Sequence, residues 1–272
     1  MQQHTAIVTE LSNTLNNRTT AIKLNLKKEK HSLPLTSYHI TQLFNTYSHV
    51  ILQEKLSTTD RWVQGSSHDL HTLIVQVFTI LANERNSSLK IEKQPELSSF
   101  KTTPKSSLFC HYGDRYPLRN KTLHNSVSSV QRWQTVQQLN AHTVAYMYFR
   151  WLNTFVKPLL IVTVDDKCAT FHLKGISTPL LHLEKVTGLT TQKISEWQIT
   201  GGLLNKEKDT LNITGRLWFV VADEAGETTI WTALTHFQPS LPWYLYKYTQ
   251  GLLHPWVMNR FAQSVKAGRS LL

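Results

Sequence analysis

The sequence predicts an α+β protein in which helices come first, an antiparallel sheet follows, and one long helix closes the chain. Three observations predict this order. Apolar residues repeat with a helical period up to Pro158 and with a period of about two after it. The strand candidates beyond Pro158 are joined by short turns that leave no room for crossover helices, which is typical of an antiparallel meander. From Leu241 to Lys266 the helical spacing returns.

The first part of the chain is predicted to be mainly helical. Apolar positions recur at helical spacing between Ile40 and Ile51 and again between Leu70 and Leu81. Each run follows a Ser or Thr that can cap a helix, so the two runs predict a helical hairpin. Short alternations at Ile22–Leu26 and Leu89–Ile91 are consistent with strands, although the first suits an exposed basic arm equally well.

Composition places a boundary between two domains in residues 85–107. This segment is rich in Ser, Lys, Thr, Pro and Glu and contains Pro95 and Pro104, which is typical of a linker. We therefore predict an N-terminal region over residues 1–107 and a ligand-binding domain over residues 108–272.

The second domain is predicted to open with a helical region and to continue as a sheet. Between Ser126 and Phe155 the apolar residues fall largely on one helical face, with a break allowed at Asn140 and an end at Pro158. Pro255 predicts a bend in the final helix. Six strands are predicted between these helices, at Leu159–Val164, Cys168–Lys174, Leu180–Glu184, Ile194–Leu204, Leu211–Ala222 and Thr228–Phe237.

The charge of the chain limits its partners. There are 29 Lys and Arg against 18 Asp and Glu, a net charge of +11 that is spread along the chain. Such a surface attracts nucleic acid, anionic lipid and acidic ligands alike. The Trp and Tyr residues are not interleaved with Lys and Arg as in nucleic-acid readers, so nucleic acid is not predicted as a partner. Leu241–Phe261 mixes Trp, Tyr, Lys and Arg as interfacial helices do, which leaves an anionic membrane surface open as a partner.

No motif for metal, cofactor or nucleophilic chemistry stands out in the sequence. There is no Gly-rich phosphate loop, no Gly-x-Ser-x-Gly elbow and no His-Glu-x-x-His. His68 and His71 share a face of a predicted helix without a third ligand nearby. Cys110 and Cys168 suit a reduced pair, although their redox state stays open. With no signal peptide and no long apolar run, we expect a cytoplasmic protein without metal or cofactor.

Five segments near the C-terminus carry a likeness to known proteins. They are Ile199-Thr-Gly-Gly-Leu-Leu204, Gly215-Arg-Leu-Trp-Phe219, Thr235-His-Phe-Gln-Pro239, Leu241-Pro-Trp-Tyr-Leu-Tyr246 and His254-Pro-Trp-Val-Met-Asn-Arg-Phe261. With the order of elements, they resemble the START/SRPBCC superfamily, and within it uncharacterised bacterial proteins, over residues 159–266. The resemblance implies a helix-grip fold, in which a curved antiparallel sheet wraps a long C-terminal helix and an apolar cavity lies between them.

The same resemblance implies that a hydrophobic or amphiphilic small molecule binds between sheet and helix, in most such proteins without catalysis. Tryptophans would supply apolar walls, and a few polar groups would fix the ligand. Each candidate also has a purely structural explanation, such as core packing for a tryptophan or the helix dipole for Arg260. The candidate ligand-binding residues are Arg216, Trp218, Trp231, His236, Trp243, His254 and Arg260.

Two alternatives stay open beside this hypothesis. On the same scaffold His236 or His254 could serve as the general base of a cyclase or hydrolase, so the sequence leaves catalysis open while favouring binding alone. The basic, aromatic final helix instead favours a membrane-surface or protein-interaction module. The identity of the ligand, the oligomeric state and the role of residues 1–107 are not predicted.

Overall fold

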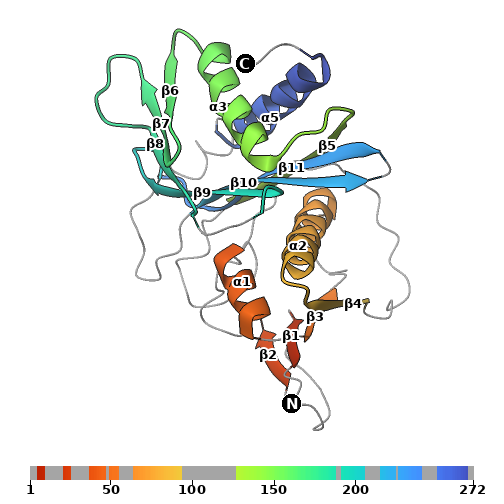
Figure 1. Ribbon diagram of the computed structural model, residues 1–272. Coiled ribbons are helices and arrows are strands. Elements are labelled where there is room, and N and C mark those ends of the chain that lie inside the picture. Colours follow the sequence, from red (N-terminus) through yellow and green to blue (C-terminus); the bar gives the residue numbers. More distant parts are fainter. Residues whose placement is uncertain are drawn as a thin grey trace.

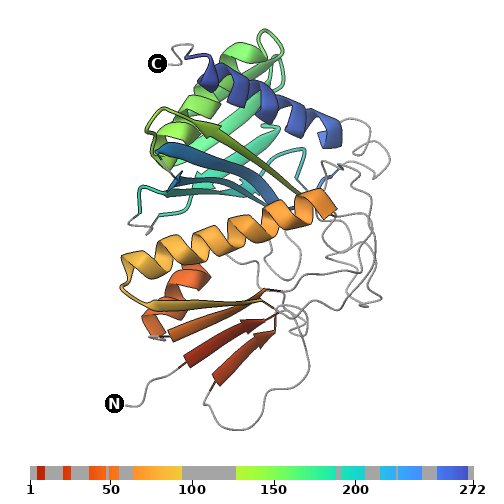
Figure 2. The same ribbon diagram turned by 90° about the vertical axis from the view of Figure 1, so that its right-hand side faces the viewer.

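The structure is arranged in four layers. Figure 2 shows them one above another: a small sheet, a pair of helices, a large sheet and a second pair of helices. The large sheet is therefore covered by helices on both faces. This computed structural model describes residues 5–9, 21–25, 37–46, 49–54, 64–93, 127–187, 191–205, 215–224, 226–240 and 250–268.

The large sheet has seven antiparallel strands in the order β5-β11-β10-β9-β8-β7-β6 (Figure 1). Helix α3 (Ala141–Phe155) connects β5 to β6, and α5 (Gln250–Lys266) follows β11. The predicted antiparallel sheet and the long C-terminal helix are confirmed. The strands are β5 (Val127–Thr135), β6 (Leu160–Val164), β7 (Cys168–Leu173), β8 (Leu181–Lys185), β9 (Ile194–Gly201), β10 (Arg216–Glu224) and β11 (Glu227–Phe237).

Strand β5 lies where the sequence analysis predicts a helix. It pairs with β11, and its Trp133 is opposite Ile230. Helix α3 begins only after Asn140, whose side-chain oxygen accepts a hydrogen bond from the amide of Thr143 at 2.7 Å. Helices cover both faces of β5, so both faces carry apolar residues. Their combined spacing imitates the period of a helix, which explains the wrong prediction.

Helices α3 and α5 cover one face of the large sheet, which we call the inner face. Aromatic side chains pack in this layer: Phe149 contacts Trp197, with ring centroids 4.9 Å apart. Tyr148 contacts Phe219 at 5.5 Å and Phe261 at 5.3 Å. All five side chains are at most 5% exposed. Their burial holds α3 and α5 on the sheet.

The small sheet has four parallel strands in the order β2-β1-β3-β4. The two predicted helices are present beside it, and the alternations near Ile22 and Leu89 form β2 and β4. The first helix, however, ends at Thr46, and Val50 and Leu52 belong to a buried strand whose apolar residues continue the helical pattern. The elements are β1 (Thr5–Thr9), β2 (Ala21–Asn25), α1 (Ser37–Thr46), β3 (His49–Glu54), α2 (Gln64–Glu84) and β4 (Ser88–Lys93).

Helices α1 and α2 cover the other face of the large sheet, which we call the outer face. Phe44 of α1 and Phe78 of α2 lie in one hydrophobic core with Trp218 and Trp231 of the sheet. The two phenylalanines also meet edge to face, with ring centroids 6.0 Å apart. The N-terminal elements and the large sheet thus share a core. The predicted boundary at residue 107 lies outside the described residues.

Candidate functional site

Three polar side chains are buried side by side on strands β5 and β11. Gln131 of β5 lies directly opposite Thr232 of β11, and Ser129 comes two residues before Gln131 on the same face of the strand. The exposed fractions of Gln131, Thr232 and Ser129 are 6%, 0% and 2%. Gln131 Nε2 donates a hydrogen bond to Ser129 Oγ at 2.7 Å. With Trp133 of the same strand, we call these residues the inner polar group.

Pairing and packing place this group on the inner face. Trp133 meets Phe261 of α5 edge to face, with ring centroids 5.9 Å apart. On the side away from β5, Thr232 pairs with Phe219 of β10, and Phe219 belongs to the core under α3 and α5. The intervening Arg132 extends to the outer face, where its guanidinium lies 5.4 Å from the ring centroid of Trp231. Gln131 and Thr232 therefore face the helices α3 and α5.

Three polar atoms of the inner polar group have no hydrogen-bond partner among the residues that the structure describes. They are Gln131 Oε1, Thr232 Oγ1 and Trp133 Nε1. A buried polar atom left unpaired costs about 1–3 kcal/mol. Native proteins keep few of them, and each is a place where a water or a ligand is expected. Their proximity on two paired strands marks the inner polar group as the candidate site.

The inner polar group can hold an uncharged polar group of a ligand. An amide oxygen accepts a hydrogen bond, an indole N–H donates one, and a threonine hydroxyl does both. The group contains no carboxylate, imidazole or amine, so it supplies no general acid or base. Within the described ranges no cluster of three or more His, Cys, Asp or Glu could hold a metal ion.

Three of the predicted ligand-binding residues lie on the outer face instead. Trp218 and Trp231 are 4% and 0% exposed in the core shared with α1 and α2. Arg216 forms a buried ion pair with Glu196 on the same face. The expectation that these residues face the final helix is thus corrected. Strands β10 and β11 are apolar on both faces, and alternation alone does not tell which face meets α5.

The other predicted residues are not brought together in the described part of the chain. Arg260 is exposed on α5, and its guanidinium lies 5.9 Å from the ring centroid of Trp256. Trp243 lies outside the described residues, as do the side chains of His236 in β11 and His254 in α5. A histidine general base therefore stays a prediction.

The inner polar group is not predicted from the sequence, because the spacing of apolar residues predicts a helix over β5. Apolar and polar residues do not alternate between Ser129 and Thr135, because Arg132 and Gln134 on either side of Trp133 are polar as well, so the sequence carries no period-two signal for a strand there. A strand brings Ser129, Gln131 and Trp133 to one face, whereas a helix would have spread them around its surface.

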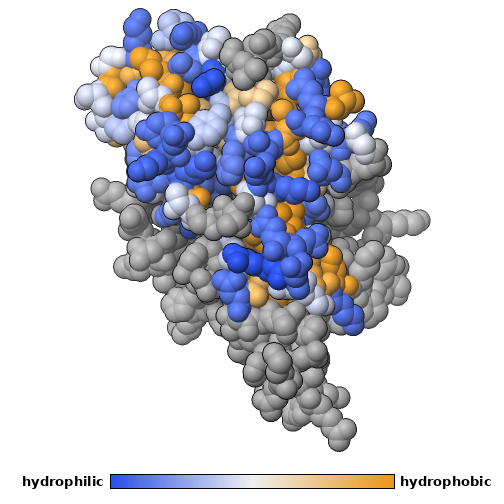
Figure 3. Space-filling model, viewed as in Figure 1, coloured by the Kyte–Doolittle hydropathy of each residue, from blue (hydrophilic) through white to orange (hydrophobic). Residues whose placement is uncertain are grey.

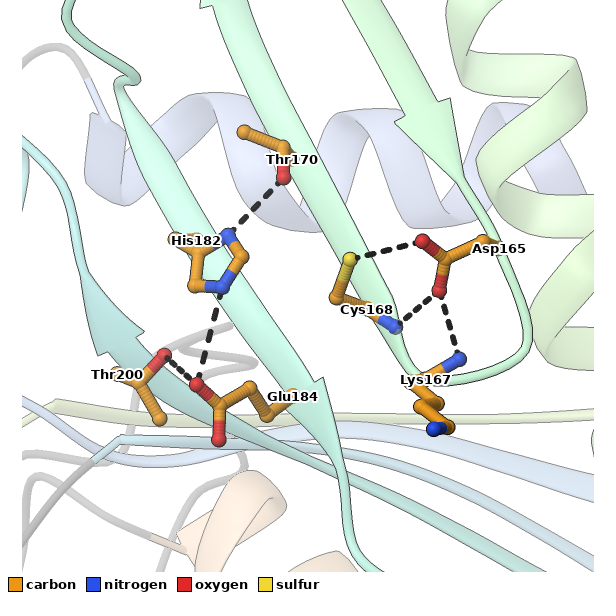
Figure 4. A network of polar contacts seen from close by, with 7 residues as sticks. All are labelled: Asp165, Lys167, Cys168, Thr170, His182, Glu184 and Thr200. Carbon is orange, nitrogen blue, oxygen red and sulfur yellow. Dashed lines mark hydrogen bonds and ion pairs between the residues drawn. The ribbon is translucent and has the colours of Figure 1, made fainter.

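A second polar network lies on the outer face of β7, β8 and β9, and Figure 4 shows it with α3 and α5 behind the sheet. His182 Nδ1 is 3.0 Å from Thr170 Oγ1, and its Nε2 is 3.8 Å from Glu184 Oε1. The Thr170 hydroxyl, the His182 imidazole and the Glu184 carboxylate thus stand in the order of a nucleophilic triad. The Glu184 side chain is, however, 60% exposed, and 3.8 Å is too long for a hydrogen bond that would orient the ring. We interpret these contacts as cross-strand pairs on a solvated face.

Cys168, which borders this network, is held in its thiol form. Its Sγ donates a hydrogen bond to Asp165 Oδ2 at 3.1 Å, and this bond, with a contribution from burial, raises the pKa of the thiol. The amides of Lys167 and Cys168 both donate to Asp165 Oδ1 at 2.7 Å, which closes the turn between β6 and β7. Cys168 therefore offers little thiolate for nucleophilic chemistry.

The topology of residues 127–266 decides the fold. The chain forms, in order, an edge strand, a helix on the inner face, six further antiparallel strands and a long helix on the inner face. The last strand, β11, pairs with the first, β5. This is the helix-grip fold. The predicted resemblance in fold to START/SRPBCC proteins is confirmed, and the fold begins at Val127 rather than at Leu159.

Comparison with known proteins adds similarity in fold only. No family model and no curated protein matches the chain. A START superfamily protein from Mycobacterium smegmatis is 10% identical, with a TM-score of 0.33 over 52% of this chain and 97% of that one. The Aha1 dimer from Colwellia psychrerythraea is 11% identical, with a TM-score of 0.35 over 53% and 99%. At such low identities and TM-scores, these structures do not indicate what this helix-grip protein binds.

Proposed function

We propose that this protein binds a hydrophobic or amphiphilic small molecule between the large sheet and the C-terminal helix, without catalysing a reaction on it. The observation that carries the proposal is the set of unpartnered polar atoms on the buried side chains of Gln131, Thr232 and Trp133. In helix-grip proteins the space between sheet and C-terminal helix is the ordinary place for a ligand. The inner polar group lies on the sheet side of that space.

The surroundings indicate the chemistry of the ligand. The inner polar group is flanked by aromatic and aliphatic side chains, among them Phe219, Leu234, Met258 and Phe261, which are at most 8% exposed. Such walls favour a ligand that is mostly apolar. Because the group itself is uncharged, the polar part of the ligand is best matched by a hydroxyl, carbonyl or amide that pairs with Gln131 and Thr232.

The first experiment identifies what the protein carries. The native mass of the protein purified from its host is measured, and the bound material is then extracted under denaturing conditions and identified. A stoichiometric apolar molecule with an uncharged polar group supports the proposal. A protein that is empty and also fails to raise the fluorescence of the neutral dye Nile red contradicts it.

Removing an unpaired polar atom is expected to stabilise the empty protein and weaken its ligand binding. Thr232→Val keeps the shape of the side chain, so the free energy of unfolding should rise by about 1 kcal/mol, because the buried hydroxyl no longer lacks a partner. Affinity for Nile red or for the extracted ligand should fall. Urea unfolding and a fluorescence titration measure the two effects.

Ser195→Ala is the matched control for this variant. Ser195 is also buried on the inner face, but its Oγ accepts a hydrogen bond from Trp197 Nε1 at 3.0 Å. Its removal leaves the indole N–H unpaired and should destabilise the protein by about 1–2 kcal/mol. If Thr232→Val destabilises the protein as Ser195→Ala does, the Thr232 hydroxyl has a partner in the empty protein, which contradicts the proposed ligand site.

A further inference from the structure

Six exposed apolar side chains gather at one end of the large sheet. They come from the end of α3, the start of β6, the connections beside β7 and β9, and α5. Each is between 36% and 67% exposed. Large apolar side chains that are exposed singly are common, whereas a contiguous set marks an interaction surface. We call this set the apolar rim, and its members are Phe155, Leu159, Ile161, Ile176, Leu203 and Trp256.

Ring and backbone contacts connect the segments that carry the rim, and Ile161 follows Leu159 by two residues on the edge strand β6. The rings of Phe155 and Trp256 lie 5.2 Å apart, and the backbone oxygen of Leu159 accepts a hydrogen bond from the amide of Lys174 at 3.0 Å. Ile176 follows Lys174 by two residues. The amide of Leu203 donates to the oxygen of Pro179 at 3.0 Å, which joins the end of β9 to the same connection.

The space-filling view shows part of this surface. In Figure 3, hydrophobic residues lie between hydrophilic ones over the upper end of the molecule, where Figure 1 places α3, β6 and β7. The members of the rim project from several elements. They are separate exposed side chains on one surface and do not line a single groove.

Among the residues that the structure describes, four cations flank the rim. Arg150, Lys157, Lys174 and Arg260 are exposed beside it. Residues 141–164, 168–183, 201–205 and 250–268 contain no Asp or Glu. Asp165 and Asp166 lie in the turn at the far end of β6, away from Leu159. An apolar surface flanked by these cations is complementary to an anionic one.

We propose that the apolar rim docks on the surface of an anionic lipid bilayer. Trp256 and Phe155 enter the interface between headgroups and acyl chains, and the four cations contact the headgroups. A bilayer accepts side chains that project from separate elements, whereas a protein partner needs a matching shape. The proposal is independent of the small-molecule site, because the inner polar group is buried and the rim is exposed. No helix in the described ranges is long and apolar enough to cross a membrane.

Vesicle co-sedimentation tests the proposal. The full chain should sediment with vesicles of phosphatidylcholine and phosphatidylglycerol, much less with phosphatidylcholine alone, and less as salt is raised. Lys157→Gln and Lys174→Gln should each lower the affinity about fivefold. Arg85→Gln, which removes an exposed cation at the opposite side of the large sheet, beyond α2, should leave it unchanged.

The apolar part of the rim is tested separately. Trp256→Ala should lower the affinity for the mixed vesicles several-fold at an unchanged melting temperature, while Val136→Ala, at a side chain 81% exposed outside the rim, should not change it. Binding without phosphatidylglycerol, equal losses in Arg85→Gln and Lys174→Gln, or no binding to either vesicle overturns the proposal. Binding to immobilised polyglutamate but not to vesicles also overturns it, since the rim would then recognise an acidic protein.

Discussion

Replacing Glu196 with alanine is expected to lower the free energy of unfolding by about 3–5 kcal/mol. The Glu196 side chain is fully buried on the outer face, where it pairs with Arg216. It also accepts hydrogen bonds from the Ser37 amide, at 3.1 Å, and from the Ser37 hydroxyl. Removal of the carboxylate leaves the Arg216 guanidinium buried without its counter-charge and the first residue of α1 without its acceptor. Urea unfolding followed by circular dichroism measures the loss.

The exposed pair of Lys193 and Asp223 provides the control. Its atoms are 3.3 Å apart, and its side chains are 51% and 64% exposed. Asp223→Asn should therefore change the free energy of unfolding by less than about 1 kcal/mol. Replacing both Glu196 and Arg216 by methionine should recover most of the loss, because no unpaired charge is then buried. Equal losses in the free energy of unfolding for Glu196→Ala and Asp223→Asn would contradict the prediction that the buried pair stabilises the protein.

Replacing Trp231 with alanine should cost about 3–5 kcal/mol, since a fully buried indole leaves a cavity between the large sheet and the N-terminal helices. Because this core is shared, the small sheet with its helices and the large sheet should unfold together, in one transition that moves to lower urea in the variant. Trp256→Ala, at a side chain 48% exposed, should change stability little. Two separate transitions, of which only one responds to Trp231→Ala, would show that residues 1–107 fold independently.

The sequence predicts the strands β6 to β11 and the final helix well, because short turns and a period of two separate them clearly. It fails at β5, where Val130 faces one core and Trp133 the other. The inner face of β5 carries the polar Ser129 and Gln131 and its outer face the exposed Arg132 and Gln134, so the strand lacks the alternation of apolar and polar residues by which strands are recognised. In β3 the buried Val50 and Leu52 continue the apolar spacing of α1, so the sequence does not separate this strand from the helix before it.

The candidate site was harder to predict than the fold. Trp218 and Trp231 are predicted as ligand contacts because they are large and lie in strands expected near the final helix. Their placement depends on which face of the sheet meets α5, and this depends on the N-terminal helices that cover the other face. Gln131 and Thr232 belong to strands distant in sequence, and only the pairing of β5 with β11 brings them together.

The position of strand β10 has a consequence for the exchange of amide hydrogens with solvent. It is paired along both edges, with β9 and β11, and it sends Phe219 into one core and Val220 into the other. No local opening can free its amides without breaking both cores, so they should exchange only when the whole molecule unfolds. Strand β6, paired only with β7 among the described strands, should exchange far sooner. Deuterium uptake along β10 would thus report the global stability of the chain at a single place.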